Sequence, residues 1–206
     1  MKLRKLEKPT ENFFIKNKGH IDKIKNRNCT KEFKIWRHSY RDLKKSYGNL
    51  LLSLKNLSST NSKSPKTKQK QAIYGFQHAL KNYSLDLYSY QQKTTKFVSK
   101  YFSSRNVPPF RKIIDAINNR MFFTIPLSFF IELHNCTKHS GALGFLIFDM
   151  GKDGIDLYIK NITTEEKDWW IGSCHSGADI YRLIVRSMRY IKDIEEDIFL
   201  VMIRLS

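Results

Sequence analysis

The sequence has few cysteines and no long hydrophobic run. Its three cysteines are Cys29, Cys136 and Cys174, and such a sparse, odd-numbered set does not build a disulfide scaffold. We therefore expect the reducing environment of the cytoplasm. No apolar run reaches the ~20 residues that cross a bilayer, and the basic first residues lack the apolar segment of a secretory signal. These absences predict a soluble cytoplasmic protein with no membrane partner.

The sequence also lacks the motifs of common nucleotide-dependent and metal-dependent enzymes. It contains no P-loop, no GxGxxG and no HExxH motif. Cys136 lies three residues before His139, and Cys174 is followed directly by His175. Two Cys and two His can bind zinc, and a Cys–His pair can form a nucleophile, so both alternatives remain open. Adjacent residues are poorly spaced to chelate one ion, however, and we predict no metal and no cofactor.

Acidic residues are scarce, and their scarcity is uneven along the chain. There are 37 Lys or Arg against 19 Asp or Glu, a formal net charge of +18. Residues 1–45 hold 15 basic and 5 acidic residues, residues 46–105 hold 10 and 1, and residues 106–206 hold 12 and 13. A positive half attracts polyanions, and this asymmetry is typical of nucleic-acid binding. We predict that the first half binds nucleic acid, RNA being favoured; the alternative is a solvated Lys-rich surface.

Two stretches carry apolar residues at alternating spacings of three and four, which is the pattern of long helices with one packing face. The first stretch comprises Trp36, Tyr40, Leu43, Tyr47, Leu50, Leu54 and Leu57. The second comprises Ile73, Phe76, Leu80, Tyr83, Leu87, Tyr90, Thr94, Phe97 and Tyr101. A polar linker at 58–67 joins them. This arrangement predicts a long antiparallel helical hairpin.

Two shorter helices are expected after the hairpin. Pro108 and Pro109 interrupt the helical pattern, and a third helix is expected at about 110–123. Pro126 suits the first turn of a fourth helix over about 127–139, because proline lacks the N–H that the first turn leaves unpaired.

A small β-hairpin and a closing helix complete the expected fold. Two short apolar runs flank Asp153-Gly154, which predicts a β-hairpin at about 143–161. A closing helix with apolar residues at helical spacing follows. The fold class is therefore mainly α, a helical bundle with a long helical hairpin and a small inserted β-hairpin. We expect a basic N-terminal arm over 1–32 and a helical domain over 33–206.

The segment from His134 to His139 places two histidines and an asparagine near the end of the fourth predicted helix. Asn135 and His139 are four residues apart and share a helical face. His134 is five residues before His139, so at ~100° per residue the two histidines point about 140° apart. The pattern resembles the signature of HEPN domains: Arg, a polar residue that is often Asn, three variable residues and His, late in a helix of a helical bundle. Here His134 stands where that signature has Arg.

The resemblance implies a site and a chemistry. Many HEPN domains are metal-independent ribonucleases, and two copies form one cleft across a homodimer. His139 would then be the acid/base group and Asn135 a ligand that holds or orients the phosphate. Unlike Arg, His134 cannot grip a phosphate with a planar fork of donors, but it can act as a second acid or base. Lys138 would supply the missing positive charge.

Further basic and aromatic side chains are candidates for contacts with nucleic acid. The basic candidates, besides Lys138, are Lys44, Lys45, Lys93, Lys96, Lys100 and Arg105. Tyr74 and Tyr88 lie off the apolar seam of the second long helix, so they are candidates to stack on bases.

Two classes of function follow. The first is an RNA-binding HEPN-like protein that acts as a metal-independent endoribonuclease of toxin or phage-defence type, with a protein partner in a toxin–antitoxin or defence complex. The second is a non-catalytic basic helical adaptor, or a nucleic-acid-binding subunit of a larger complex. Position 134 separates them, because an Arg there would complete the signature.

Overall fold

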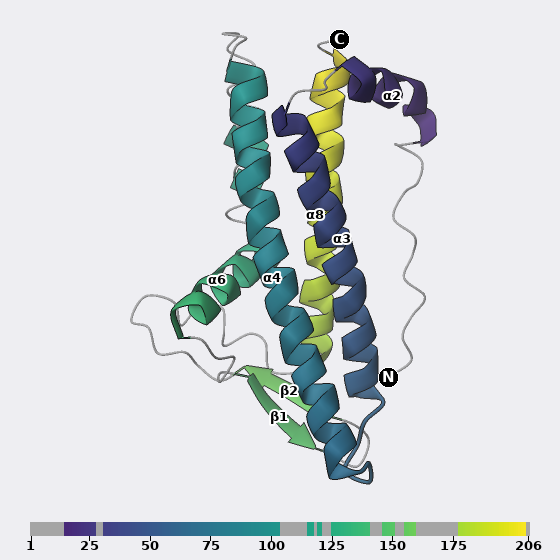
Figure 1. Cartoon of the computed structure of the whole chain (residues 1–206), viewed down its shortest axis with the longest axis vertical. Helices are drawn as coiled ribbons and strands as arrows, with labels where there is room; N and C mark the ends of the chain where they lie inside the picture. The colour runs from purple at the N-terminus through teal and green to yellow at the C-terminus, as the bar shows by residue number, and fades with distance from the viewer. Residues whose placement is uncertain are drawn as a thin grey trace.

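A computed structural model gives the architecture of the chain. It describes residues 15–27, 31–103, 115–117, 119–120, 125–140, 146–150, 155–159 and 177–204. The helices are α2 (Lys18–Arg27), α3 (Lys31–Ser58), α4 (Lys66–Ser103), α6 (Ile125–Ser140) and α8 (Gly177–Arg204), and the strands are β1 (Leu146–Met150) and β2 (Ile155–Ile159). The prediction of a mainly helical chain is confirmed, and Figure 1 shows the long helices side by side.

Helices α3 and α4 pack along the two apolar seams. Buried seam residues include Trp36, Tyr40, Leu43, Leu50, Leu54 and Leu57 of α3 and Phe76, Leu80, Tyr83, Leu87, Tyr90, Thr94 and Phe97 of α4. The ring centroids of Trp36 and Phe97 lie 4.8 Å apart, those of Tyr40 and Tyr90 5.9 Å, and those of Tyr47 and Tyr83 6.0 Å. Because the residue number rises in α3 as it falls in α4, the two helices run in opposite directions (Figure 1).

A tight connection joins α3 to α4. The backbone N–H of Asn61 bonds to the hydroxyl of Ser64 at 3.2 Å, and the side-chain amide of Gln69 donates to the carbonyl of Ser64 at 2.8 Å. Pro65 precedes the first helical residue, where no N–H is needed. These bonds fix the end of the hairpin, which lies at the bottom of Figure 1.

Helices α8 and α6 close the core. Ile184, Ile191, Ile194 and Ile198 of α8 are fully buried against it, and the rings of Phe199 and Trp36 approach to 5.7 Å. On α6, Phe130 meets Tyr83 edge to face at 5.0 Å. Apolar burial on this scale is the main stabilising contribution to such a bundle.

Part of the expected N-terminal arm packs on the bundle. Ile21 and Ile24 of α2 are each 2% exposed and belong to the core, and α2 contacts α8 near the C-terminal end of that helix (Figure 1). The basic charge of α2 is therefore held beside α3 and α8.

The strands β1 and β2 pair antiparallel, from Leu146 opposite Ile159 to Met150 opposite Ile155. The tip of this pair, at 151–154, lies outside the described residues. Of the helix expected at 110–123, residues 115–117 and 119–120 are described and are helical.

Candidate nucleic-acid interface

A hollow of about 600 Å³ over α3 gathers cationic side chains from three helices. The charged residues that line it are Lys25 of α2, Lys34, Arg37, Arg41 and Asp42 of α3, and Lys93 of α4. We call this site the basic hollow. Five cations and one carboxylate line the hollow, and two of the cations, Lys25 and Arg37, have acidic partners just outside it. The remaining positive charge favours a negative ligand.

The one carboxylate of the basic hollow is engaged within α3. A guanidinium nitrogen of Arg41 lies 3.1 Å from Nδ1 of His38, and Nε2 of His38 lies 3.5 Å from Asp42. Arginine can only donate, so Nδ1 accepts and the ring proton sits on Nε2, facing Asp42. The carboxylate therefore interacts with His38, and its negative charge still offsets one of the five cations.

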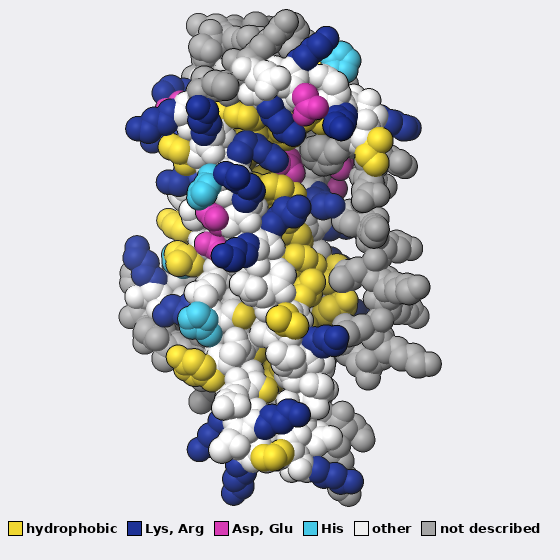
Figure 2. All heavy atoms as spheres, turned by 45° about the vertical axis from the view of Figure 1, so that its right-hand side comes forward, with side chains coloured by type: hydrophobic (Ala, Val, Ile, Leu, Met, Phe, Trp, Pro, Cys, Tyr) yellow, Lys and Arg dark blue, Asp and Glu magenta, His cyan; other side chains and the backbone are white. Residues whose placement is uncertain are grey.

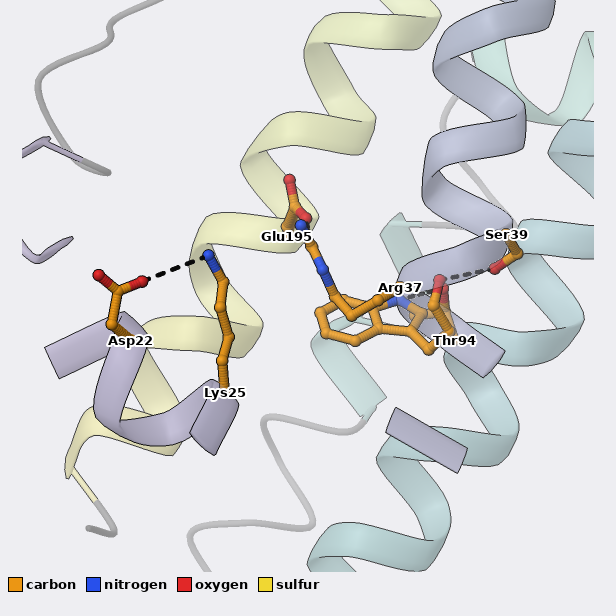
Figure 3. Close-up of polar contacts among 7 residues, drawn as sticks. Asp22, Lys25, Arg37, Ser39, Thr94 and Glu195 are labelled. Carbon is orange, nitrogen blue, oxygen red and sulfur yellow. Dashed lines mark hydrogen bonds and ion pairs between the residues drawn. The ribbon is translucent and has the colours of Figure 1, made fainter. Parts of the chain in front are cut away.

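Arg37 ties the basic hollow to the core. Its guanidinium points from α3 toward Glu195 of α8 and forms an ion pair with that carboxylate, which is 2% exposed (Figure 3). The same guanidinium lies 5.1 Å from the ring centroid of Tyr40 and 5.4 Å from that of Phe199. Burial lowers the pKa of Arg37, yet arginine stays charged in proteins. Arg37 thus joins α3 to α8 and shares its charge with Glu195.

The other cations of the basic hollow differ in their partners. Lys25 forms an ion pair with Asp22, one turn away on α2, at 3.7 Å (Figure 3). Lys34 and Lys93 are both exposed and form no ion pair with any residue in the described part of the chain. Their charges are the ones most available to a ligand.

The lysines of the two long helices that were predicted to contact nucleic acid are exposed, but they do not form one cluster. Lys93 lines the basic hollow. Lys44 lies above the ring of Tyr40, 5.8 Å from its centroid, while Lys45 is exposed on the same helix.

Farther along α4, Lys96 and Lys100 lie beside Glu32. The ammonium group of Lys100 pairs with the carboxylate of Glu32. This hydrogen bond is the main cause of the lowered pKa of Glu32, with a smaller contribution from the charge of Lys96. Arg105 lies outside the described residues. One acid therefore offsets part of the charge predicted to bind nucleic acid.

A long stretch of α3 and α4, with the connection between them, carries no acidic residue. Residues 43–85 hold eight lysines and no Asp or Glu. On the face in Figure 2, acidic side chains of the described residues lie in the upper half, and the lower end shows Lys and Arg alone among charged groups. That lower end is the connected end of α3 and α4 (Figure 1). On this face, the described residues at the connected end of α3 and α4 thus form a second region that carries positive charge alone.

The histidine motif lies at the end of α6. The His134 ring is half-buried and stacks on Tyr88 of α4, with centroids 4.7 Å apart and planes 25° apart. Burial lowers the pKa of His134, and the charge of Lys138 lowers it further. Asn135 is half-buried and Lys138 is exposed. The backbone of His139 belongs to α6, while its side chain lies outside the described part.

Tyr88 differs from the expectation of an exposed stacking residue. The seam pattern places Tyr88 off the α3 contact, but α6 covers that side of α4 and half-buries the ring against His134. Tyr74 has no such cover and is 70% exposed.

Sequence reasoning missed Lys25, Lys34 and Arg41 as members of one site. Each belongs to a basic stretch that the charge count singled out. Nothing local distinguishes them from neighbouring cations, because their convergence on Lys93 depends on how α2, α3 and α4 pack.

Comparisons with known proteins give no relative: no protein-family model matches the chain, and no curated protein or solved structure matches it. Among the described residues, no helix combines the length and apolarity needed to cross a membrane. The described part likewise holds no group of three or more His, Cys, Asp or Glu placed to bind a metal.

Proposed function

We propose that this protein binds nucleic acid, with RNA favoured, and that the basic hollow contacts the phosphate backbone. The observation that carries the proposal is the convergence of Lys34, Arg41 and Lys93, which form no ion pair with the described residues, beside Lys25 and Arg37 in one hollow. Phosphate contacts of Lys and Arg release condensed counterions, so they supply affinity without sequence preference. The net charge of +18 strengthens long-range attraction to such a ligand.

Salt dependence tests this proposal. For single-stranded RNA, each neutralised phosphate contributes about −0.7 to the slope of log K against log salt. The double variant Lys34→Gln and Lys93→Gln removes two exposed lysines that form no ion pair with the described residues, and should make the slope shallower by about 1.4. Fluorescence anisotropy of a labelled RNA strand across a salt series measures this change.

A matched control removes the same charge elsewhere. Arg186 and Arg189 are exposed on α8, a helix with as many acidic as basic residues. Arg186→Gln with Arg189→Gln should leave the slope unchanged. Binding that ignores salt, or equal slopes for the two double variants, contradicts the assignment to the basic hollow.

A ribonuclease activity is the second proposal, and His134 supports it. Its lowered pKa favours the neutral ring at pH 7, which is the form that accepts a proton. Asn135 and Lys138 follow it in the sequence, one and four residues later. The HEPN resemblance adds His139 as the partner group and a homodimer as the assembly, in a cytoplasmic toxin or phage-defence system with a protein partner.

The non-catalytic adaptor is the competing proposal. It needs the basic hollow and makes no use of the histidines. RNA that is bound but never cleaved, together with equal behaviour of the parent and a His139→Ala variant, favours the adaptor.

A further inference from the structure

A line of exposed side chains follows the outer face of α4. Its members are Lys70, Tyr74, His78, Lys81 and Leu85, all exposed, and we call them the outer stripe. At ~100° per residue they fall within about 80° of one another and face away from the seam that packs on α3. Tyr74 is 70% exposed and Leu85 is 47% exposed.

The aromatic part of the outer stripe is held in place. The rings of Tyr74 and His78, one turn apart, have centroids 6.4 Å apart and planes only 24° apart. The side-chain amide of Asn82 lies 3.2 Å from Nδ1 of His78, so the next turn positions the His78 ring. Two nearly parallel rings one turn apart on a helix already present a face on which a third ring can stack.

Charge and position link the outer stripe to the basic hollow. The stripe lies in the region without acids, residues 43–85. Farther along α4, Ser89 and Lys93 line the basic hollow. At ~100° per residue they lie about 100° and 140° round the helix from Lys70, so the path from the stripe to the hollow winds partly around α4. From Lys70 to Lys93 the helix rises about 35 Å at ~1.5 Å per residue. A polyanion that winds across the outer face of α4 therefore meets lysines at both ends and the rings of Tyr74 and His78 between them.

We propose that the outer stripe is a base-stacking platform for single-stranded nucleic acid that continues into the basic hollow. Every base has a π face, so an exposed aromatic ring binds it with little sequence preference, while lysines hold the backbone. In a duplex the bases are already stacked on each other, which makes the single strand the matching ligand. This inference rests on the proposed nucleic-acid binding. It adds that the ligand is single-stranded and that the outer stripe is the site that contacts its bases.

An abasic strand separates stacking from charge. The probes are an oligoadenylate of about ten nucleotides, which spans about 34 Å at ~3.4 Å per nucleotide, and a strand of the same length without bases. Tyr74→Ala should weaken binding of the intact strand roughly 5-fold to 100-fold and leave binding of the abasic strand unchanged. Tyr74→Phe should retain the parent affinity, because the ring remains.

Tyr190→Ala provides the matched control, since Tyr190 is 37% exposed on α8, and it should leave both affinities unchanged. Two results overturn the platform while sparing the proposed function: salt-dependent binding that Tyr74→Ala does not weaken, or a loss that is equal for the intact and abasic strands. If the parent protein binds neither strand at low salt, the proposed function fails and the platform fails with it.

Discussion

The indole nitrogen of Trp36 donates a hydrogen bond to the hydroxyl of Thr94 at 3.1 Å, and both side chains are fully buried. The bond joins α3 to α4 across 58 residues of sequence. The threonine hydroxyl in turn donates to the backbone carbonyl of Tyr90 at 2.8 Å. Because the bond forms only when Trp36 and Thr94 lie opposite each other, it favours this register of the two long helices.

Thr94→Val tests this bond, because valine keeps the shape and removes the acceptor. The buried indole N–H is then unpaired, which should lower the free energy of unfolding by about 1–3 kcal/mol. Thr94→Ser keeps the hydroxyl and should lose less. Urea unfolding followed by circular dichroism compares them. If Thr94→Val is as stable as the parent, the bond does not contribute.

The ion pair between Arg37 and Glu195 predicts a non-additive response to substitution. Arg37→Met leaves a carboxylate that is 2% exposed without its partner, and removing one partner of a buried pair costs roughly 3–5 kcal/mol. Adding Glu195→Leu should restore much of that stability, since no buried charge remains. Thermal unfolding of Arg37→Met, of Glu195→Leu and of the double variant gives the coupling free energy between the two side chains. Arg41→Met, at an exposed position of the same helix, is the control, and additive effects would refute the coupling.

His134 should titrate below its ordinary value of 6.5. Burial is the larger cause of the lowered pKa and the charge of Lys138 is the smaller one, so Lys138→Gln should raise the pKa of His134. NMR titration of the ring protons measures it. Lys44→Gln, which removes the same charge from an exposed position of α3, should leave that pKa unchanged. An unaltered pKa in Lys138→Gln would show that Lys138 does not act on the ring.

The same shift sets the sign of a pH effect on stability. Because the folded-state pKa is lowered, the folded protein binds fewer protons than the unfolded chain in the window below pH 6.5. The contribution of His134 to the free energy of unfolding is therefore fully present above pH 6.5, and it is lost as the pH falls through the lowered pKa. His134→Gln should flatten the fall in unfolding free energy across that window.

If the protein cleaves RNA, His139→Ala should abolish cleavage without changing RNA affinity, because the imidazole moves protons and adds little to binding. His134→Ala should also reduce the rate, whereas His134→Arg should keep or raise it by gripping the phosphate with two hydrogen bonds. EDTA should have no effect, since the proposed chemistry uses no metal. Gel assays of a labelled RNA, with anisotropy for affinity, separate cleavage from binding.

The sequence by itself determined the two long helices and the residues on their buried faces. The spacing of three and four from Trp36 to Leu57 is a local property of the chain, and most of those residues are buried. Local periodicity also separated Tyr74 from the seam of α4, and Tyr74 is exposed. The positive sign of the first half could be counted directly.

Only the tertiary structure decided what lies on the other faces of those helices. Tyr88 is off the same seam as Tyr74, yet α6 brings His134 against it. Ile21 and Ile24 are two apolar residues in a polar segment, too few to predict a docked helix, and they become core when α8 covers them. The basic hollow depends on the same long-range packing. A repeat in the sequence fixes which residues share a face, because helical geometry is local, but which helix covers that face is decided by burial summed over the whole bundle.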